Sequence, residues 1–496
     1  MIGLWLSSLL SILIAALVMP FFGVQRKRLM MWFGCGVLTY ALIAHAFTTM
    51  FVLREGAFTY QFGGHEATLG VSFLIDPLAL LINGMILLLS WLIFFYGWAN
   101  TKMDFEKAET HRYVALTFIL VFSMMSMVYT NDLFNTYVFM EIMSITTCAI
   151  ISVKRKKENY AAAFRYLMLN EIGSLSYLLG LGFVYVLTGH LNIDAAASGM
   201  RVAFATHSTA AVMGLSLMVL GLMIKAAIFP LHVWLPDAHA SAPSTSSAML
   251  SAIVVKVYLV VLYKVLYRVF GFTALYAIRF DWVLLTLAML GMVMGSLFAM
   301  AQKDVKRMLG YSSVSQVGYI LLGLSLGTPL GVSAALFHIV SHALLKSALF
   351  LSVGSFIAQY GKRRVRSLRG LGLQMPISTT VFSIAALGMI GIPITSGFLA
   401  KWALGLALAD VAPWVILVVL GSSVLNAMYY LPILIDFYLK PNDEKQVTLT
   451  IDRVPKRMLV VLGVFALLIV GLGLYPVWLN LWIERALTFF SVGGLS

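Results

Sequence analysis

The stretch Ile224–Pro243, which reads IKAAIFPLHVWLPDAHASAP, decides how the whole chain is interpreted. It continues the apolar run AAVMGLSLMVLGLM, which is typical of a membrane-spanning helix. Pro230 lacks a backbone donor, and its ring would clash with the carbonyl group of Ala226. Backbone groups freed in this way are tolerated inside a bilayer only where protein or water satisfies them. The stretch therefore predicts a broken membrane helix with Lys225 beside a hydrated interruption.

The composition extends this interpretation to the whole chain. Of 496 residues, 61% are hydrophobic and 11% are charged, and the mean hydropathy is +0.94. Runs of about twenty apolar residues, each able to cross ~30 Å of hydrocarbon, recur from end to end. Membrane barrels are excluded because their strands alternate polar and apolar residues. We expect residues 1–496 to form a single all-α polytopic membrane domain with about fourteen helices, which begin near Ile2, Met30, Val71, His111, Leu133, Ala161, Ala211, Ser244, Phe280, Met308, Gly331, Ile377, Ala412 and Met458.

The basic residues predict the orientation, because loops rich in Lys and Arg stay on the cytoplasmic side. They cluster after the odd-numbered helices, at 26–28, 154–157, 303–307, 361–370 and 440–457. We therefore expect both termini on the non-cytoplasmic side of the cell inner (plasma) membrane. The net charge of +14 then reflects topology and does not indicate a nucleic-acid partner.

Cofactor chemistry has no support in the sequence. Cys35 and Cys148 are the only cysteines, and two isolated thiols hold neither an iron–sulfur cluster nor a structural zinc ion. A glycine-rich phosphate loop is also missing from the sequence. We expect no cofactor, no metal site and no catalytic redox residue in this chain.

Ionisable residues near the middle of the expected helices are the candidate functional residues. Such a residue costs roughly 2.5–3.5 kcal/mol at the bilayer centre, and it is retained where it pairs or lines a wet path. His338, His342 and Lys346 follow one another at a spacing of four, which keeps them on one helix face. Together with His232 of the interrupted stretch, the candidates are Glu141, Lys225, His232, Lys256, His338, His342, Lys346 and Lys401.

Less demanding interpretations compete for several charged residues. Lys264 and Asp436 lie toward helix ends, where their side chains can snorkel to the membrane interface. Glu171 fits local packing or pairing as well as it fits a functional role. The mid-span lysines could form static ion pairs, but four of them are many for that purpose. A histidine such as His338 is, taken alone, more often a satisfied core residue.

A second interruption indicates an internal repeat. Gly391, Pro393 and Gly397 precede Lys401, as Pro230 and its neighbours follow Lys225. Paired interruptions mark the repeats of many transporters, and a spacing of five helices makes the two repeats inverted. Helices 4–8 and 9–13 are the expected units. Lysine suits proton transfer, since burial favours its neutral form and a nearby carboxylate restores its charged form, and Glu141 is the candidate carboxylate.

Five motifs strengthen this interpretation: NDLFNTYVFMEIMSI, IKAAIFPLHVWLPDAHASAPS, QKDVKRMLGYSSVSQVGYI, HIVSHALLKSALFL and GIPITSGFLAKW. In this order they resemble the antiporter-like membrane subunits of the complex I superfamily. That family includes the Mrp-D proteins of sodium/proton antiporters, the pumping M, N and L proteins of complex I, and counterparts in energy-converting membrane-bound hydrogenases. The resemblance implies fourteen helices with the seventh and twelfth broken.

The resemblance also implies roles for individual residues. Glu141 matches the family's helix 5 glutamate, and the lysines Lys225, Lys256 and Lys401 match its ion-path residues in helices 7, 8 and 12. His342 and Lys346 match the family's helix 11 pair. Lysine in helix 12 is similar to the Mrp-D type, whereas PDAHASAPS is similar to the hydrogenase and complex I branches. We favour an Mrp-D-like member of an Mrp or hydrogenase-type complex and leave the branch open.

The expected function is translocation of protons, or of sodium and protons, by a subunit that works with other membrane subunits in the lipid bilayer. Whether it serves a redox-driven pump or an Mrp antiporter stays open. The alternative is a stand-alone secondary solute or cation transporter, to whose pocket Ser241–Ser247 would contribute, although this run fits a helix N-cap equally well. We expect a polar file in the order Lys225, Lys256, His342, Lys346 and Lys401, with Glu141 within ion-pair reach of Lys225 and the exit near Lys401.

Overall fold

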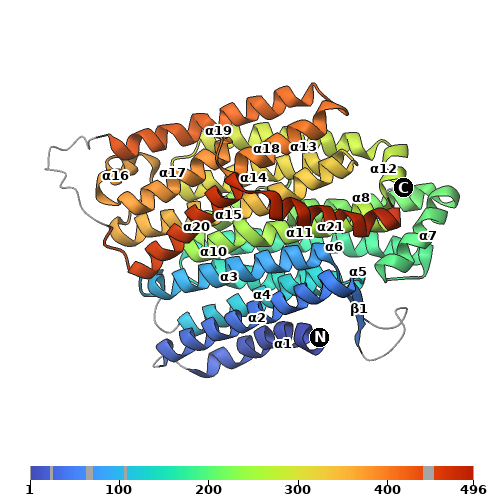
Figure 1. Ribbon diagram of the computed structural model, residues 1–496, viewed down its shortest axis with the longest axis horizontal. Coiled ribbons are helices and arrows are strands. Elements are labelled where there is room, and N and C mark those ends of the chain that lie inside the picture. The colour runs from blue at the N-terminus through green and yellow to red at the C-terminus, as the bar shows by residue number, and fades with distance from the viewer. Residues whose placement is uncertain (1, 23–25, 63–70, 105–108, 440–451, 495–496) are drawn as a thin grey trace.

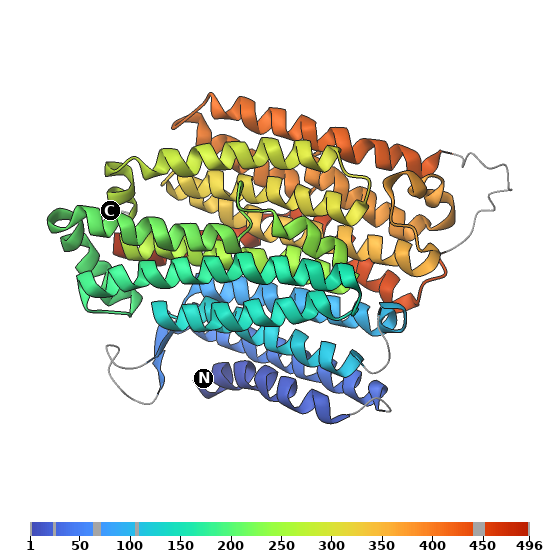
Figure 2. The same cartoon turned by 180° about the vertical axis from the view of Figure 1, so that it is seen from behind.

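The computed structural model describes residues 2–22, 26–62, 71–104, 109–439 and 452–494. Its helices lie side by side along the long axis of one elongated bundle (Figures 1 and 2). Hydrophobic side chains fill the inside of the bundle, as expected for a chain in which apolar runs recur throughout. In the described part of the chain, twelve helices are long and apolar enough to cross a membrane.

The first half of the bundle contains six uninterrupted passages followed by a broken one. Its elements are α1 (Ile2–Val18) with η1 (Met19–Phe22), α2 (Lys27–Glu55), α3 (Pro77–Asp104), α4 (Thr110–Tyr129), α5 (Leu133–Ser152), α6 (Lys157–Thr188), and α8 (Ser208–Lys225) followed by α9 (Trp234–Ser241). The strands β1 (Phe58–Gln61) and β2 (Ser72–Ile75) pair antiparallel between α2 and α3. The helix α7 (Ile193–Thr206), which the sequence analysis did not foresee, lies between α6 and α8.

The next passage is built from α10 (Ser244–Met249), η4 (Leu250–Val254), α11 (Val255–Tyr263) and η5 (Lys264–Phe270) in direct succession. The elements η4 and η5 are π-helical, a conformation often found at functional sites. We call Ser244–Phe270 the central helix, because every residue of its apolar 18-residue stretch is buried inside the protein. Only α15 (Pro329–Tyr360) shares this property among the described candidate spans.

The second half repeats the pattern. After α12 (Phe272–Ala277) come α13 (Phe280–Met300), α14 (Val305–Ser325), α15, η6 (Val365–Leu368), α16 (Leu371–Gln374), α17 (Pro376–Ile390), α18 (Ser396–Ala409), α19 (Val415–Tyr438), α20 (Lys456–Leu474) and α21 (Val477–Gly494). The passages α14 and α17–α18 are too polar or too short to count among the twelve candidates. With these two passages, the described bundle agrees with the expected fourteen, and α20 and α21 follow each other along it (Figure 1).

Both expected helix interruptions are present. The helix α8 ends at Lys225, and Ala227 adopts a positive φ of 53° before α9 begins. The indole of Trp234 donates to the carbonyl oxygen of Ile224 at 2.8 Å, so the interruption satisfies one freed backbone group from within the protein. In the second break, Gly391 and Ile394 have φ values of 98° and 76°. Passages alternate in direction, so the two broken helices run oppositely along the bundle.

Glycines allow α6 and α8 to touch along their backbones. A Cβ atom built on Gly221 would lie 2.4 Å from the carbonyl oxygen of Gly173, and one built on Gly180 would lie 2.7 Å from that of Gly214. Small residues at such positions let membrane helices approach closely. This contact fixes α8, and with it Lys225, against the bundle.

The two ends of the bundle differ. The helix α1 begins and α21 ends toward the end that carries α7 and β1, and α16 lies at the opposite end (Figure 1). We call these the α7 end and the α16 end. Since passages alternate, the basic clusters at 26–28, 154–157, 303–307 and 361–370 belong to the α16 end. Residues 440–451 of the last basic cluster, with Lys440 and Lys445, lie outside the described residues.

Candidate functional site: a buried file of lysines and histidines

The expected ion pair between Glu141 of α5 and Lys225 of α8 is confirmed, with Oε1 and Nζ separated by 3.6 Å. The Lys225 side chain is completely buried, whereas 19% of the Glu141 side chain is exposed. Nζ of Lys225 also donates to Oγ of Ser144 at 2.5 Å, and the Ser174 hydroxyl donates to Glu141. A buried ammonium ion is therefore held by one carboxylate and one hydroxyl group at the end of a broken helix.

Glu171 of α6 joins this pair. Its carboxylate lies within electrostatic range of both Glu141 and Lys225. Two carboxylates thus face one ammonium ion, an arrangement in which like charges oppose each other and only one of them is neutralised by Lys225. The sequence left the role of Glu171 open, and the structure places it beside the ion pair.

Tyr258 of the central helix lies near this pair. Its hydroxyl is buried, and it lies close to Ser144 and within electrostatic range of Glu141. Lys256 is on the same helix two residues earlier. Its ammonium group donates to the carbonyl oxygen of Ser251, in the π-helical segment η4.

Lys256 belongs to a cluster in the middle of the molecule. Lys346 of α15 donates to the carbonyl oxygen of Leu309 at 2.8 Å and to Oγ of Ser312 at 2.9 Å. His342, one turn earlier on α15, lies within electrostatic range of both Lys256 and Lys346. Because the three side chains are all at most 1% exposed, the cluster is closed to lipid.

Protein atoms alone do not satisfy this cluster. Among the described residues, neither ring nitrogen of His342 has a hydrogen-bond partner. The same holds for His239, which is fully buried within electrostatic range of Lys256, Lys306 and Lys346. Buried polar atoms in proteins are almost always bonded to protein or to ordered water. Water between these rings and the lysines is therefore the expected partner.

Lys401 lies at the far side of the file, in the second broken helix. Its Nζ donates to the carbonyl oxygens of Met389 and Ile390 at 3.0 and 2.9 Å, and to Oγ of Ser423 at 3.0 Å. The two carbonyl groups form the last turn of α17, where the helix dipole favours a cation.

The link from Lys401 to the cluster runs through two rings. Nζ of Lys401 lies 4.8 Å from the ring centroid of Tyr319, which stacks on His338 with centroids 5.5 Å apart. The rings of His338 and His342 are 6.1 Å apart. His338, rather than Lys346, is thus the candidate that borders Lys401, which changes the expected order of the file.

His232 is not brought into this cluster. Its ring stacks between Phe229 and Phe298 at 5.4 and 6.0 Å and meets the edge of Tyr311. Among the described residues, no lysine lies within electrostatic range of the His232 ring. Its part in a proton path stays a prediction, and an aromatic packing role describes its surroundings better.

Two residues of this region were not among the predicted candidates, and a third was interpreted wrongly. His239 and Lys306, whose Nζ donates to the carbonyl oxygen of Ala242 at 2.5 Å, connect the cluster toward the α16 end. His239 stands in the quoted stretch and was visible there as a second histidine. Lys264 was expected to snorkel, and this is wrong, because the residue is only 5% exposed and its ammonium group is turned inward.

These features define the class: a helical membrane protein in which two inverted broken helices and a central helix hold a file of ionisable groups away from lipid. Residues 130–426 match the family model described as "NADH:quinone oxidoreductase/Mrp antiporter, TM". The chain belongs to this family.

Similar proteins agree with that assignment. NADH-quinone oxidoreductase subunit N of Desulforudis audaxviator is 37% identical over 78% of this chain and 77% of its own length. The putative antiporter subunit mnhD2 of Staphylococcus aureus strain Mu3 is 29% identical over 95% of this chain and 94% of its own. A chain in the membrane-bound sulfane sulfur reductase, an archaeal respiratory membrane complex, has a TM-score of 0.88 at 29% identity and covers 99% of this chain and 98% of its own.

Proposed function

We propose that this chain is a proton-translocating, antiporter-like subunit of a multisubunit membrane complex. The observation that carries the proposal is the Glu141–Lys225 ion pair at the start of a file that continues through Lys256 to Lys401. Mid-membrane ionisable groups cost free energy unless they share partners or water. Groups that take turns in holding a charge, each beside the next, are suited to passing protons.

The proposed route begins at Glu141 and Lys225 and continues past Tyr258 to Lys256. From there it passes His342 and Lys346, then His338, and ends at Lys401. Lys306 and His239 give the middle of this route a connection toward the α16 end. Lysine is suited to each step because its compact ammonium group can lose a proton when desolvated, which the guanidinium of arginine in effect cannot do.

The basic loops and the relatives support a proposal for the orientation in the membrane and for the partner subunits. We propose that the α16 end faces the cytoplasm of a cell with this protein in its plasma membrane, so that both termini lie on the other side. The two relatives described above are named as subunits, and the similar structure belongs to a complex, which favours partner subunits over a stand-alone transporter. Protons are the proposed cargo, and sodium is a second candidate for the same complex.

The test is proton transport by the complex purified through a tag on this chain and reconstituted into vesicles. A pH-sensitive dye should report acidification that is lost in Lys225→Ala, while subunit composition is unchanged. The chain reconstituted alone separates the two functions, since transport at the rate of the whole complex would support the stand-alone transporter. Labelling of Arg364→Cys only from the cytoplasm would support the orientation, and labelling from outside would contradict it.

A further inference from the structure

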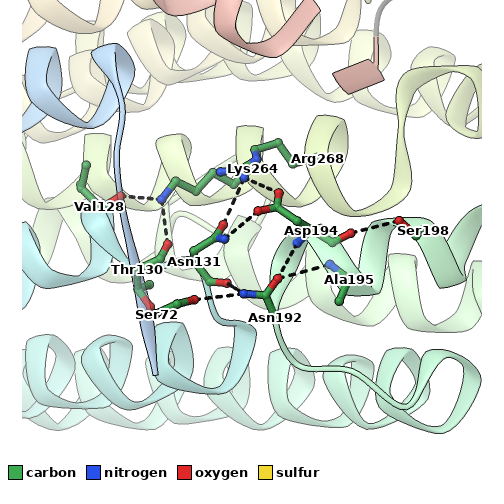
Figure 3. Close-up of polar contacts among 10 residues, drawn as sticks. All are labelled: Ser72, Val128, Thr130, Asn131, Asn192, Asp194, Ala195, Ser198, Lys264 and Arg268. Atoms are coloured by element: carbon green, nitrogen blue, oxygen red, sulfur yellow. Dashed lines mark hydrogen bonds and ion pairs between the residues drawn. The ribbon is translucent and has the colours of Figure 1, made fainter. Parts of the chain in front are cut away.

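A further buried lysine, Lys264, lies toward the α7 end of the bundle, apart from the file. Lys264 begins η5, and its Nζ donates to the carbonyl oxygens of Val128, and of Thr130 at 3.1 Å (Figure 3). These carbonyl groups form the end of α4, where the helix dipole favours a cation. The ammonium ion is therefore held inside the protein, although a short reach along its helix would bring it to the membrane surface.

A carboxylate accompanies this cation. Asp76 precedes α3, and its Oδ1 accepts a hydrogen bond from the backbone N–H of Ala79 at 2.7 Å. The residue is 2% exposed, and in the described part of the chain no donor reaches its Oδ2. Lys264 and Arg268 lie within electrostatic range of the carboxylate. A buried carboxylate oxygen without a donor is costly, so water or a transferable proton is expected there.

A chain of polar groups leads from this pair to the surface. Arg268, one turn after Lys264, donates from Nη2 to Asp194 Oδ1 at 2.6 Å and to Asn131 Oδ1 at 3.1 Å (Figure 3). Nδ2 of Asn131 donates to the other oxygen of Asp194 at 2.8 Å. The side chain of Asp194 is 62% exposed and that of Arg268 is 9% exposed. The network thus reaches solvent at Asp194, and its Arg268 lies within electrostatic range of both Asp76 and Lys264.

Lys264 of this pair lies on the same helix as Lys256 of the file. Lys256 and Lys264 are eight residues apart, a spacing that places both on one helix face. At 1.5 Å per residue the separation along the helix is about 12 Å. Each lysine borders a π-helical segment, η4 before Lys256 and η5 from Lys264 onward. Irregular segments of this kind occur frequently at functional sites and leave carbonyl groups free to bind other partners.

We propose that Asp76 and Lys264 form a proton-holding pair that exchanges protons between the file at Lys256 and solvent at the α7 end. The ammonium group of Lys264 passes a proton through water to Oδ2 of Asp76, and the neutral amine keeps its hydrogen bonds to the carbonyl groups of α4. The carboxylic acid then releases the proton to water beside Arg268 and Asp194. The other titratable groups facing the pair are the hydroxyls of Tyr129 and Tyr263.

This pair would connect the file with solvent at the α7 end, and proton transport along the file would depend on that connection. The inference rests on the proposed function, because the pair has nothing to exchange unless the file carries protons. It assigns a transport role to two residues outside the expected route.

Asp76→Asn in the complete complex tests the pair. Asparagine caps a helix as well as aspartate does, so assembly should be preserved, and proton transport should fall about a hundredfold, as for the loss of a proton-transfer group. The matched control is Asp132→Asn. Asp132 caps α5 by accepting from the backbone of Asn135, and no charged side chain acts on it among the described residues. Its variant should transport within about twofold of the wild type, since its cap is retained.

A pH profile separates transport from folding. In Asp76→Asn the dependence of the rate on pH at the α7 end should change, while the dependence on pH at the α16 end is kept. Wild-type transport by Asp76→Asn would overturn the proposal. Equal losses in Asp76→Asn and Asp132→Asn would also overturn it, because they would reduce both residues to helix caps.

Lys264→Arg gives an independent test if Asp76→Asn does not assemble. The guanidinium keeps the positive charge and the donors for the carbonyl groups of Val128 and Thr130, but it does not release a proton. Loss of transport in the assembled variant supports the pair, and a wild-type rate overturns it. If Lys264→Arg transports normally while Lys225→Ala does not, only this inference fails. If both transport normally, the proposed function fails as well.

Discussion

The two broken helices place their lysines in different electrostatic surroundings. Lys225 ends α8 and faces the carboxylate of Glu141 at 3.6 Å, with Glu171 close by. Lys401 lies within α18, where its three hydrogen bonds go to two carbonyl groups and the Ser423 hydroxyl. The first lysine is thus tied to a partner whose charge can change, and the second to fixed dipoles. Inverted repeats that each contain a broken helix need not hold their protons in the same way.

The largest effect is expected at the first break. Glu141→Ala and Lys225→Ala should each lower proton transport by about a hundredfold or more, because each removes half of the proton-transfer pair. The measurement is dye-reported acidification by the reconstituted complex, with subunit composition as the control for assembly. Transport at the wild-type rate in either variant would make this pair structural and remove the contrast with Lys401.

A similarly large loss is expected between the two breaks. Lys256→Arg keeps a positive charge on the central helix but cannot give up its proton, so transport should fall by about a hundredfold. Binding of partner subunits and thermal stability should stay close to those of the wild type, which native gels and melting curves can follow. A fully active Lys256→Arg would mean that this lysine acts only as a fixed charge.

The two breaks differ in backbone conformation, and substitutions there should change the free energy of unfolding differently. At Gly391 of the second break, φ is 98°, and a Cβ atom would lie 3.0 Å from Cδ of Lys401. Gly391→Ala should therefore destabilise the protein by about 1–3 kcal/mol. The first break holds Ala227 at a φ of 53°, so Ala227→Gly should be neutral or stabilising. Melting temperatures of the two variants check this, and equal shifts would contradict it.

The smallest effect on transport is expected from removing one hydrogen-bond acceptor of Lys401. Ser423→Ala deletes a hydrogen bond at 3.0 Å and leaves both carbonyl acceptors. The loss is about 1 kcal/mol, or roughly fivefold in rate. Initial transport rates over a range of driving pH gradients can resolve it. A loss as large as that of Glu141→Ala would show that Lys401 depends on a single partner as strongly as Lys225 does.

Local sequence signals predicted much of this molecule. Apolar runs gave the passages, and Pro230 and Gly391 marked the interruptions because their effects on the backbone need no tertiary context. The helical spacing of His338, His342 and Lys346 placed them on one face, and all three are buried in the structure. Glu141 and Lys225 were paired because a lone charge in the middle of each helix needs a partner.

What the sequence could not predict depends on how a helix is rotated among its neighbours. Lys264 lies near the end of the central helix, where a lysine can turn either outward to the membrane surface or inward, and packing alone decides. The structure turns it toward α4. The link between Lys401 and the cluster is likewise tertiary, since Tyr319 and His338 come from two different helices. His239 was missed because a short helix carries it from the interruption into the lysine cluster.

The glycine contact between α6 and α8 limits how these two helices can move during transport. With carbonyl oxygens of one helix filling the space that a side chain would take on the other, α8 can neither roll nor slide along α6 without breaking van der Waals contact over several turns. Alternating access by rocking helices, as in many carriers, is therefore disfavoured at this seam. Transport would then depend on movements of side chains and water between helices that keep their positions. A chemical cross-link between α6 and α8 should therefore leave transport intact.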